Sequence, residues 1–94
     1  MDSGELYQKK YQYERFIRKL NDSYSKLGTC YSNLLSCKKK IGNCILINGK
    51  YYSSSEFQKI IDNVSNYRDK IAYTILPQAR YEYNKILSQI SELG

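Results

Sequence analysis

The sequence has no histidine and no tryptophan, and it contains one proline among its 94 residues. Histidine is the commonest general base near neutral pH and the commonest metal ligand, so its absence excludes every Ser-His-Asp arrangement. No glycine-rich phosphate-binding loop is present either. Asp62 and Asp69 are seven residues apart with basic residues nearby, which favours solvated helix charges over an acid–base pair. The sequence therefore predicts a protein that is not an enzyme and uses no cofactor.

Long apolar runs are also missing. The longest one, Cys44 to Ile47, has four residues, whereas a membrane-spanning helix needs about 20. The first twenty residues are rich in Lys, Gln, Tyr, Arg and Glu, which is unlike a secretory leader. We therefore expect no membrane insertion, and a chain that is made and folded in the cytoplasm.

The spacing of the three cysteines argues against a metal site. Cys30, Cys37 and Cys44 follow one another at intervals of seven residues. On one helix, Cys30 and Cys37 would be about 10.5 Å apart, beyond the roughly 7 Å limit for a disulfide. A zinc site would need a fourth ligand and a closer pair. We interpret the cysteines as small residues flanking a core, and a Cys37–Cys44 or intermolecular bridge would require an oxidising environment.

Positive charge is abundant and unevenly placed. The net charge is +6, and residues 1–47 hold nine Lys or Arg against four acids, whereas residues 48–94 hold six against five. Such an excess attracts nucleic acid, anionic lipid or an acidic protein, although a solvated helix face is the commoner explanation. Because no recognised nucleic-acid motif accompanies the charge, we expect no nucleic-acid partner.

The first half of the chain carries a heptad repeat. Apolar residues recur every seventh position, with a second set between them, and this spacing indicates a long amphipathic helix. Phe16, Cys30 and Cys37 lie beside this seam, and Gly28 marks a bend or a close helix contact. Gly42 ends the pattern, so we predict a helix over about residues 4–41. The seam consists of Leu6, Tyr13, Ile17, Leu20, Tyr24, Leu27, Tyr31, Leu34 and Ile41.

The second half carries a matching stripe after a run of serines that can cap a helix. Its spacing is interrupted once, because the steps between Ile71 and Tyr83 are four, four and four. Pro77 lies in that interval and predicts a kink, with two helices split near residue 76 as the alternative. Arg68 occupies the one polar place, where its stem covers the seam. We predict a helix over about 55–92, with the stripe Phe57, Ile61, Val64, Ile71, Ile75, Ala79, Tyr83, Ile86, Ile90 and Leu93.

These two patterns predict an all-α fold, a single helical-hairpin domain over residues 1–94 with a bend at 42–54. Each helix would be about 55 Å long, and the second would be kinked near Pro77. Asn48-Gly49 is by itself a strong signal for a β-hairpin turn. We interpret the segment as a bend, too short for an independent sheet, in which Ile45, Ile47 and Tyr51 close the end of the hairpin.

The second helix has more apolar residues than one partner helix can cover. Ile60, Tyr67 and Tyr81 form a second flank at multiples of seven, and Leu76 and Leu87 add to the opposite side. A hairpin with such a surplus usually packs against further helices. We therefore predict that these five residues contact a partner, the alternative being that their exposure is simply tolerated.

The architecture resembles the WXG-type small secreted proteins of Gram-positive type VII secretion, and more closely the small LXG-associated helical proteins, the YwqH-like family. The resemblance covers the whole chain through its layout. Ile47-Asn48-Gly49 stands where a W-x-G bend would be, and Ser-rich capping and Phe57 follow it. Tryptophan is replaced by Ile47, and the only Y-x-x-x-D/E match, Tyr52 to Glu56, lies in the bend rather than after the second helix.

The resemblance implies a targeting chaperone for an LXG-type toxin. It implies a chain that binds the toxin's helical N-terminal domain, together with a second small helical protein in some complexes, and presents the toxin to the secretion machine. Ile47, Gly49 and Phe57 would fix the bend. In isolation the chain could form a homodimer, and its location would be cytoplasmic unless it is secreted with the effector. The alternative is a small basic bacteriocin immunity protein, which would form a compact four-helix bundle instead of a rod.

Overall fold

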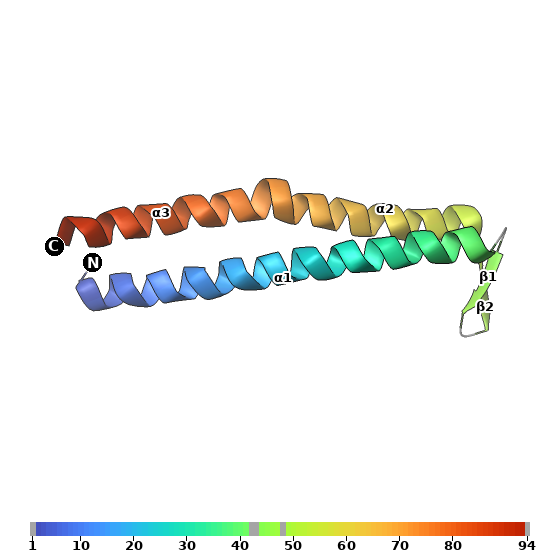
Figure 1. The fold of residues 1–94 in the computed structure, drawn as a ribbon, viewed down its shortest axis with the longest axis horizontal. Helices are drawn as coiled ribbons and strands as arrows, with labels where there is room; N and C mark the ends of the chain where they lie inside the picture. The colour runs from blue at the N-terminus through green and yellow to red at the C-terminus, as the bar shows by residue number, and fades with distance from the viewer. Residues whose placement is uncertain (1, 42–43, 48, 94) are drawn as a thin grey trace.

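The computed structural model describes residues 2–41, 44–47 and 49–93, and it is a rod made of two antiparallel helical arms (Figure 1). The first arm is α1 (Ser3–Ile41). The second runs through α2 (Ser54–Lys70), a π-helical turn η1 (Ile71–Ile75) and α3 (Leu76–Leu93). The extents are 63 × 22 × 16 Å and the radius of gyration is 19.9 Å. The predicted helical hairpin is thus confirmed.

Both predicted seams face the partner arm except at Leu93, the last residue of the second stripe, which is 53% exposed. On α1, Leu6 is buried, and the seam residues from Tyr13 to Leu34 are half-buried. On the second arm, Phe57, Ile61, Ala79 and Ile86 are buried. Because a two-helix rod can cover only one stripe of each helix, the core is thin and runs along the whole length of the arms.

The second arm passes Pro77 without a break. An α-helix would place the Pro77 ring against the carbonyl of Tyr73 and would lose one hydrogen bond. Instead, η1 widens the helix just before the proline, and the Leu76 N–H donates to the Ile71 carbonyl, five residues back. A π turn holds one extra residue. This is the residue by which the four-four-four steps exceed the heptad, so the irregular spacing and the π turn have the same origin.

The connection between the arms is a β-hairpin, which corrects the interpretation of residues 42–54 as a plain bend. Strands β1 (Cys44–Ile47) and β2 (Lys50–Ser53) are antiparallel, and Cys44 pairs with Ser53 and Ile47 with Lys50. Gly49 has φ +79°, in the left-handed region where glycine alone is unstrained. The two-residue turn signal therefore prevailed over the short length of the strands. Ile45, Ile47 and Tyr51 were predicted to close the end of the helical hairpin, and their side chains lie outside the described residues.

Ser53 joins the β-hairpin to the second arm. Its hydroxyl accepts a hydrogen bond from the Glu56 N–H (3.2 Å), and the Glu56 carboxylate accepts one from the Ser53 N–H (3.0 Å). This reciprocal capping box satisfies backbone donors at the start of α2. Phe57 follows and is buried, so the helix begins with its first apolar side chain already in the core.

Candidate interaction surface

The five residues predicted to contact a partner have different surroundings. Tyr67 and Tyr81 are about 60% exposed, at 61% and 60%, and Ile60 and Leu87 are exposed at 39% and 36%. Leu76 is only 4% exposed, so its assignment to the partner surface is wrong. It follows η1 directly, where the widened turn rotates the next residues and carries Leu76 into the core.

The same π turn separates the remaining four. Ile60 and Tyr67 each precede an inward residue, Ile61 and Arg68. Beyond η1 the inward positions are displaced by one residue, so the position equivalent to Tyr67 is Glu82 and not Tyr81. Leu87 follows the buried Ile86 and therefore belongs to the opposite flank. The sequence interval of fourteen residues between Tyr67 and Tyr81 does not place them on one face.

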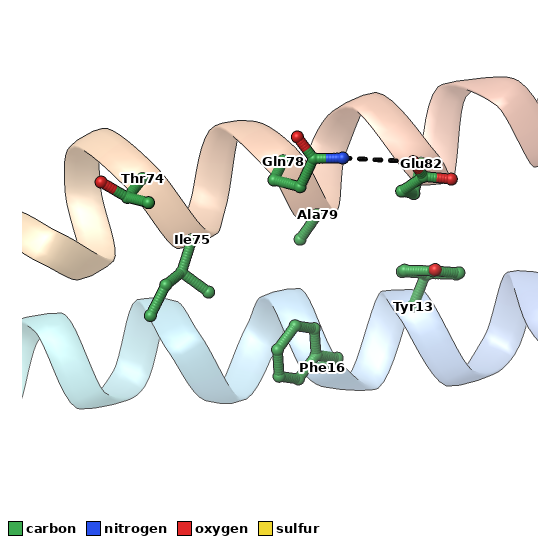
Figure 2. Close-up of a pocket in the computed structure, with 7 residues that line it drawn as sticks. All are labelled: Tyr13, Phe16, Thr74, Ile75, Gln78, Ala79 and Glu82. Carbon is green, nitrogen blue, oxygen red and sulfur yellow. Dashed lines mark hydrogen bonds between the residues drawn. The ribbon is translucent and has the colours of Figure 1, made fainter.

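An apolar groove lies between α1 and the second arm beside the π turn (Figure 2). It has a volume of about 360 Å³. In Figure 2, Ile75 and Ala79 point toward α1, and the rings of Phe16 and Tyr13 stand opposite them. Phe16 is 46% exposed, so a large apolar side chain remains accessible in the groove. The lining residues are Tyr13, Phe16, Thr74, Ile75, Gln78, Ala79 and Glu82.

Phe16 also borders two further hollows along α1. One is lined by Lys9, Gln12, Tyr13 and Phe16, and the other by Gln12, Arg15, Phe16 and Lys19. The concavity around Phe16 therefore combines aromatic carbon with the basic side chains of Lys9, Arg15 and Lys19. We call the groove and these two hollows the Phe16 groove.

The net charge of the molecule resides on α1. Within Ser3–Ile41 there are nine Lys or Arg and three acids, whereas residues 54–93 contain five of each. The first arm thus carries a net +6 and the second arm is neutral. A partner of opposite charge would be drawn to the α1 side of the rod.

The acidic groups near the Phe16 groove are engaged by neighbours. Glu82, which lines it, accepts a hydrogen bond from Gln78 (3.1 Å) and lies 3.8 Å from the Lys85 ammonium. Glu14 accepts a hydrogen bond from the Tyr83 hydroxyl (2.8 Å). This hydrogen bond, with smaller contributions from burial and from the negative charge of Glu14, raises the pKa of the Tyr83 phenol above its usual value.

The predicted bend residues have distinct places. Gly49 occupies the turn of the β-hairpin and Phe57 is buried in the first turns of α2. The Ile47 backbone belongs to β1, and its side chain is outside the described residues. Cys30 and Cys37 are exposed free thiols on α1, so they do not line the core.

Membrane-spanning helices and metal-binding clusters are both absent from the described part of the chain. No helix in it is apolar enough, over a sufficient length, to cross a membrane. Across the same residues, no three Cys, Asp or Glu side chains gather closely enough to hold a metal ion.

The Phe16 groove was missed at the level of sequence. Phe16 was recognised only as a residue beside the seam, and the four-four-four spacing on the other arm was the signal that a widened turn lies somewhere between Ile71 and Tyr83. Which part of α1 lies opposite that turn depends on how the arms are aligned.

Comparisons with known protein families, curated proteins and solved structures find no match for this chain.

Proposed function

We propose that this chain is a non-enzymatic adaptor that binds the helical N-terminal domain of an LXG-type effector of type VII secretion and helps to direct that effector to the secretion machine. The single observation that carries the proposal is a long, thin hairpin that leaves large apolar side chains uncovered. Phe16, Ile60 and Tyr67 are 46%, 39% and 61% exposed. They lie at equivalent positions, each just before an inward residue, along the same flank of an antiparallel pair.

The mechanism is lateral packing. A rod of 63 Å presents this flank to the long helices of a partner, and burial of Ile60 and Tyr67 would remove apolar surface from water on both molecules. Packing of this kind protects the effector's helices before export. It can also build a composite secretion signal from two chains. A second small helical protein could occupy the remaining flank, which contains Leu87.

The alternative function is a small basic bacteriocin immunity protein. That reading expects a compact four-helix bundle with a radius of gyration of about 13 Å for a chain of this size. The observed radius of 19.9 Å, with the described residues arranged as two antiparallel arms, favours the adaptor.

Co-expression provides the test. The chain is produced with the N-terminal domain of an LXG toxin, chosen from the genes beside its own where one is encoded there, and the mixture is separated by size-exclusion chromatography. The adaptor proposal expects one peak that contains both proteins, and it expects Tyr67→Ala with Ile60→Ala to weaken that complex. Separate elution of the two wild-type proteins would refute it.

A further inference from the structure

We propose that the Phe16 groove is the docking site for an acidic amphipathic helix, a partner chemistry that deepens the adaptor function and rests on it. The partner helix would insert an apolar side chain between Phe16 and Ala79 and would place carboxylates against the basic residues along α1. The proposal names a site on the hairpin and the chemistry that it selects.

The apolar part of the argument comes from the shape of the groove. Two arms form the walls of its part beside Ile75 and Ala79, so that part accepts a side chain from the side of the rod as a ridge fits between two helices. Phe16 is 46% exposed, although Ala79 is only 5% exposed on the facing arm. A small residue opposite a large, accessible ring leaves space for a third side chain above them. Figure 2 shows Ala79 and Phe16 facing each other from the two arms, next to Ile75.

The electrostatic part comes from the rim. Lys9, Arg15 and Lys19 border the hollows that continue from Phe16. The one acidic residue in the lining, Glu82, already lies beside Gln78 and Lys85, which offsets its charge. The surroundings are therefore positive, and a partner with carboxylates on either side of its apolar ridge complements them.

Other occupants fit less well. A second copy would bring its own α1, with nine basic residues against three acids, toward an equally basic rim. A lipid surface is flat, whereas this site is a recess between two helices. Nucleic acid would match the charge but would leave the apolar wall of Ile75 and Ala79 without a ridge to fill it.

The π turn positions one wall of the site. In a continuous heptad the residue after Ile75 on the inward stripe would be residue 78. The extra residue moves that place to Ala79, and an alanine there is short enough to leave the recess open. The groove is thus a local consequence of the irregular spacing, and the rest of the rod has no reason to repeat it.

The experiment uses the full chain and two synthetic peptides of about 20 residues, long enough to form helix in part. Both carry leucines at helical spacing, and they differ only in their flanking residues, which are glutamates in one and lysines in the other. Amide chemical-shift changes in the nitrogen-15-labelled protein show where each peptide binds. The proposal expects the acidic peptide to shift residues 13–19 and 74–82, and the basic peptide to leave them unchanged.

Matched variants separate the two parts of the argument. Phe16→Ala should weaken binding of the acidic peptide about tenfold or more, as expected for a central aromatic anchor. Tyr11→Ala, an aromatic truncation on the same helix outside the groove, should change it less than about twofold. The triple variant Lys9→Glu, Arg15→Glu, Lys19→Glu should abolish the preference for the acidic peptide. Lys26→Glu, Lys59→Glu, Lys70→Glu also lowers the net charge from +6 to 0, and it should retain most of that preference.

Several results would overturn the docking site. One is equal binding of both peptides, and another is a set of amide chemical-shift changes that lies outside the groove. Equal effects of the two triple variants would also overturn it, as would Phe16-dependent binding of anionic vesicles by a protein that does not bind the acidic peptide. Circular dichroism of each variant confirms that the helices remain.

The two proposals fail separately: if the effector domain binds wild type and Phe16→Ala equally, the adaptor stands and the docking site falls. If the acidic peptide binds at Phe16 but the effector domain does not bind, the adaptor falls.

Discussion

The guanidinium of Arg68 stacks on the ring of Tyr24, with its central carbon 4.1 Å from the ring centroid. Its Nε also donates to the Tyr24 carbonyl at 3.4 Å. Gly28 lies one turn further along α1, and a Cβ built there would be 2.8 Å from the Arg68 guanidinium. The glycine in the middle of α1 therefore makes room for a cross-arm contact, which is the second of the two roles expected for it.

Gly28→Ala is predicted to stabilise the protein less than helix propensity alone implies. In an unobstructed helix interior, alanine is favoured over glycine by about 1 kcal/mol. When Arg68 is present, the new methyl group displaces its guanidinium from the Tyr24 ring, and part of that gain is lost. The full gain should return in an Arg68→Ala background. Chemical denaturation of the four proteins in a double-mutant cycle measures the coupling, and additive free energies would contradict it.

Deletion of Pro77 is predicted to be tolerated. It removes the residue that lacks an N–H and also the one residue by which the inward stripe exceeds the heptad, so a continuous α-helix can replace η1 with the inward residues in place. The thermal unfolding midpoint should remain close to that of the wild type or rise.

Deletion of Asn63 is the matched control. It also removes one exposed residue, but from the regular part of α2. Every inward residue on one side of the deletion would rotate by about 100° relative to the other side. A large drop in the unfolding midpoint is expected. Similar midpoints for the two deletions would show that the π turn does not absorb the extra residue.

The Tyr83–Glu14 hydrogen bond is predicted to make stability fall at alkaline pH. Because the pKa of the Tyr83 phenol is raised in the folded protein, the unfolded chain loses this proton at a lower pH. The contribution is therefore fully present below the ordinary tyrosine pKa of about 10 and is lost as pH rises through the folded value. The free energy of unfolding, measured with urea from neutral pH to pH above 10, should decline less steeply for Tyr83→Phe than for wild type.

Tyr81→Phe is the control for that measurement, because Tyr81 is 60% exposed and also lies on α3. It should leave the alkaline decline unchanged, since other tyrosines contribute equally to both proteins. An equal effect of the two substitutions would mean that the bond to Glu14 is not the cause. Glu14→Gln, which removes the negative acceptor, should also flatten the curve.

Loss of the Ser53 cap is predicted to destabilise the hairpin. Ser53→Ala removes the acceptor for the Glu56 N–H and disrupts the capping box, at a cost of about 1 kcal/mol. Ser23→Ala, the same change at an exposed position inside α1, should change the free energy of unfolding by less than about 0.5 kcal/mol. Urea unfolding compares the two, and equal losses would rule out a specific role for the cap.

Most of the fold could be predicted because the heptad repeat carries the necessary information. Apolar residues at alternating steps of three and four fix which side of each helix faces inward, and Leu6 and Ile61 are indeed buried. The surface was harder to predict. Leu76 was assigned outward because the inward stripe was taken to pass directly from Ile75 to Ala79, although the widened turn before it carries Leu76 into the core as well. The two strands were not predicted because the sequence interpretation gave the flanking helical patterns more weight than the turn preference of Asn48-Gly49.

By itself, the sequence determined that the chain forms two long helices, that they reverse between residues 41 and 54, and that one extra residue lies near Pro77. Those properties depend on spacing, capping and turn preferences, which are local. Tertiary structure alone decided that Phe16 lies opposite Ala79, and that Gly28 lies under Arg68. Such pairings depend on how far one arm slides along the other. The connecting β-hairpin and the packing of both seams set that alignment together, and neither helix encodes it alone.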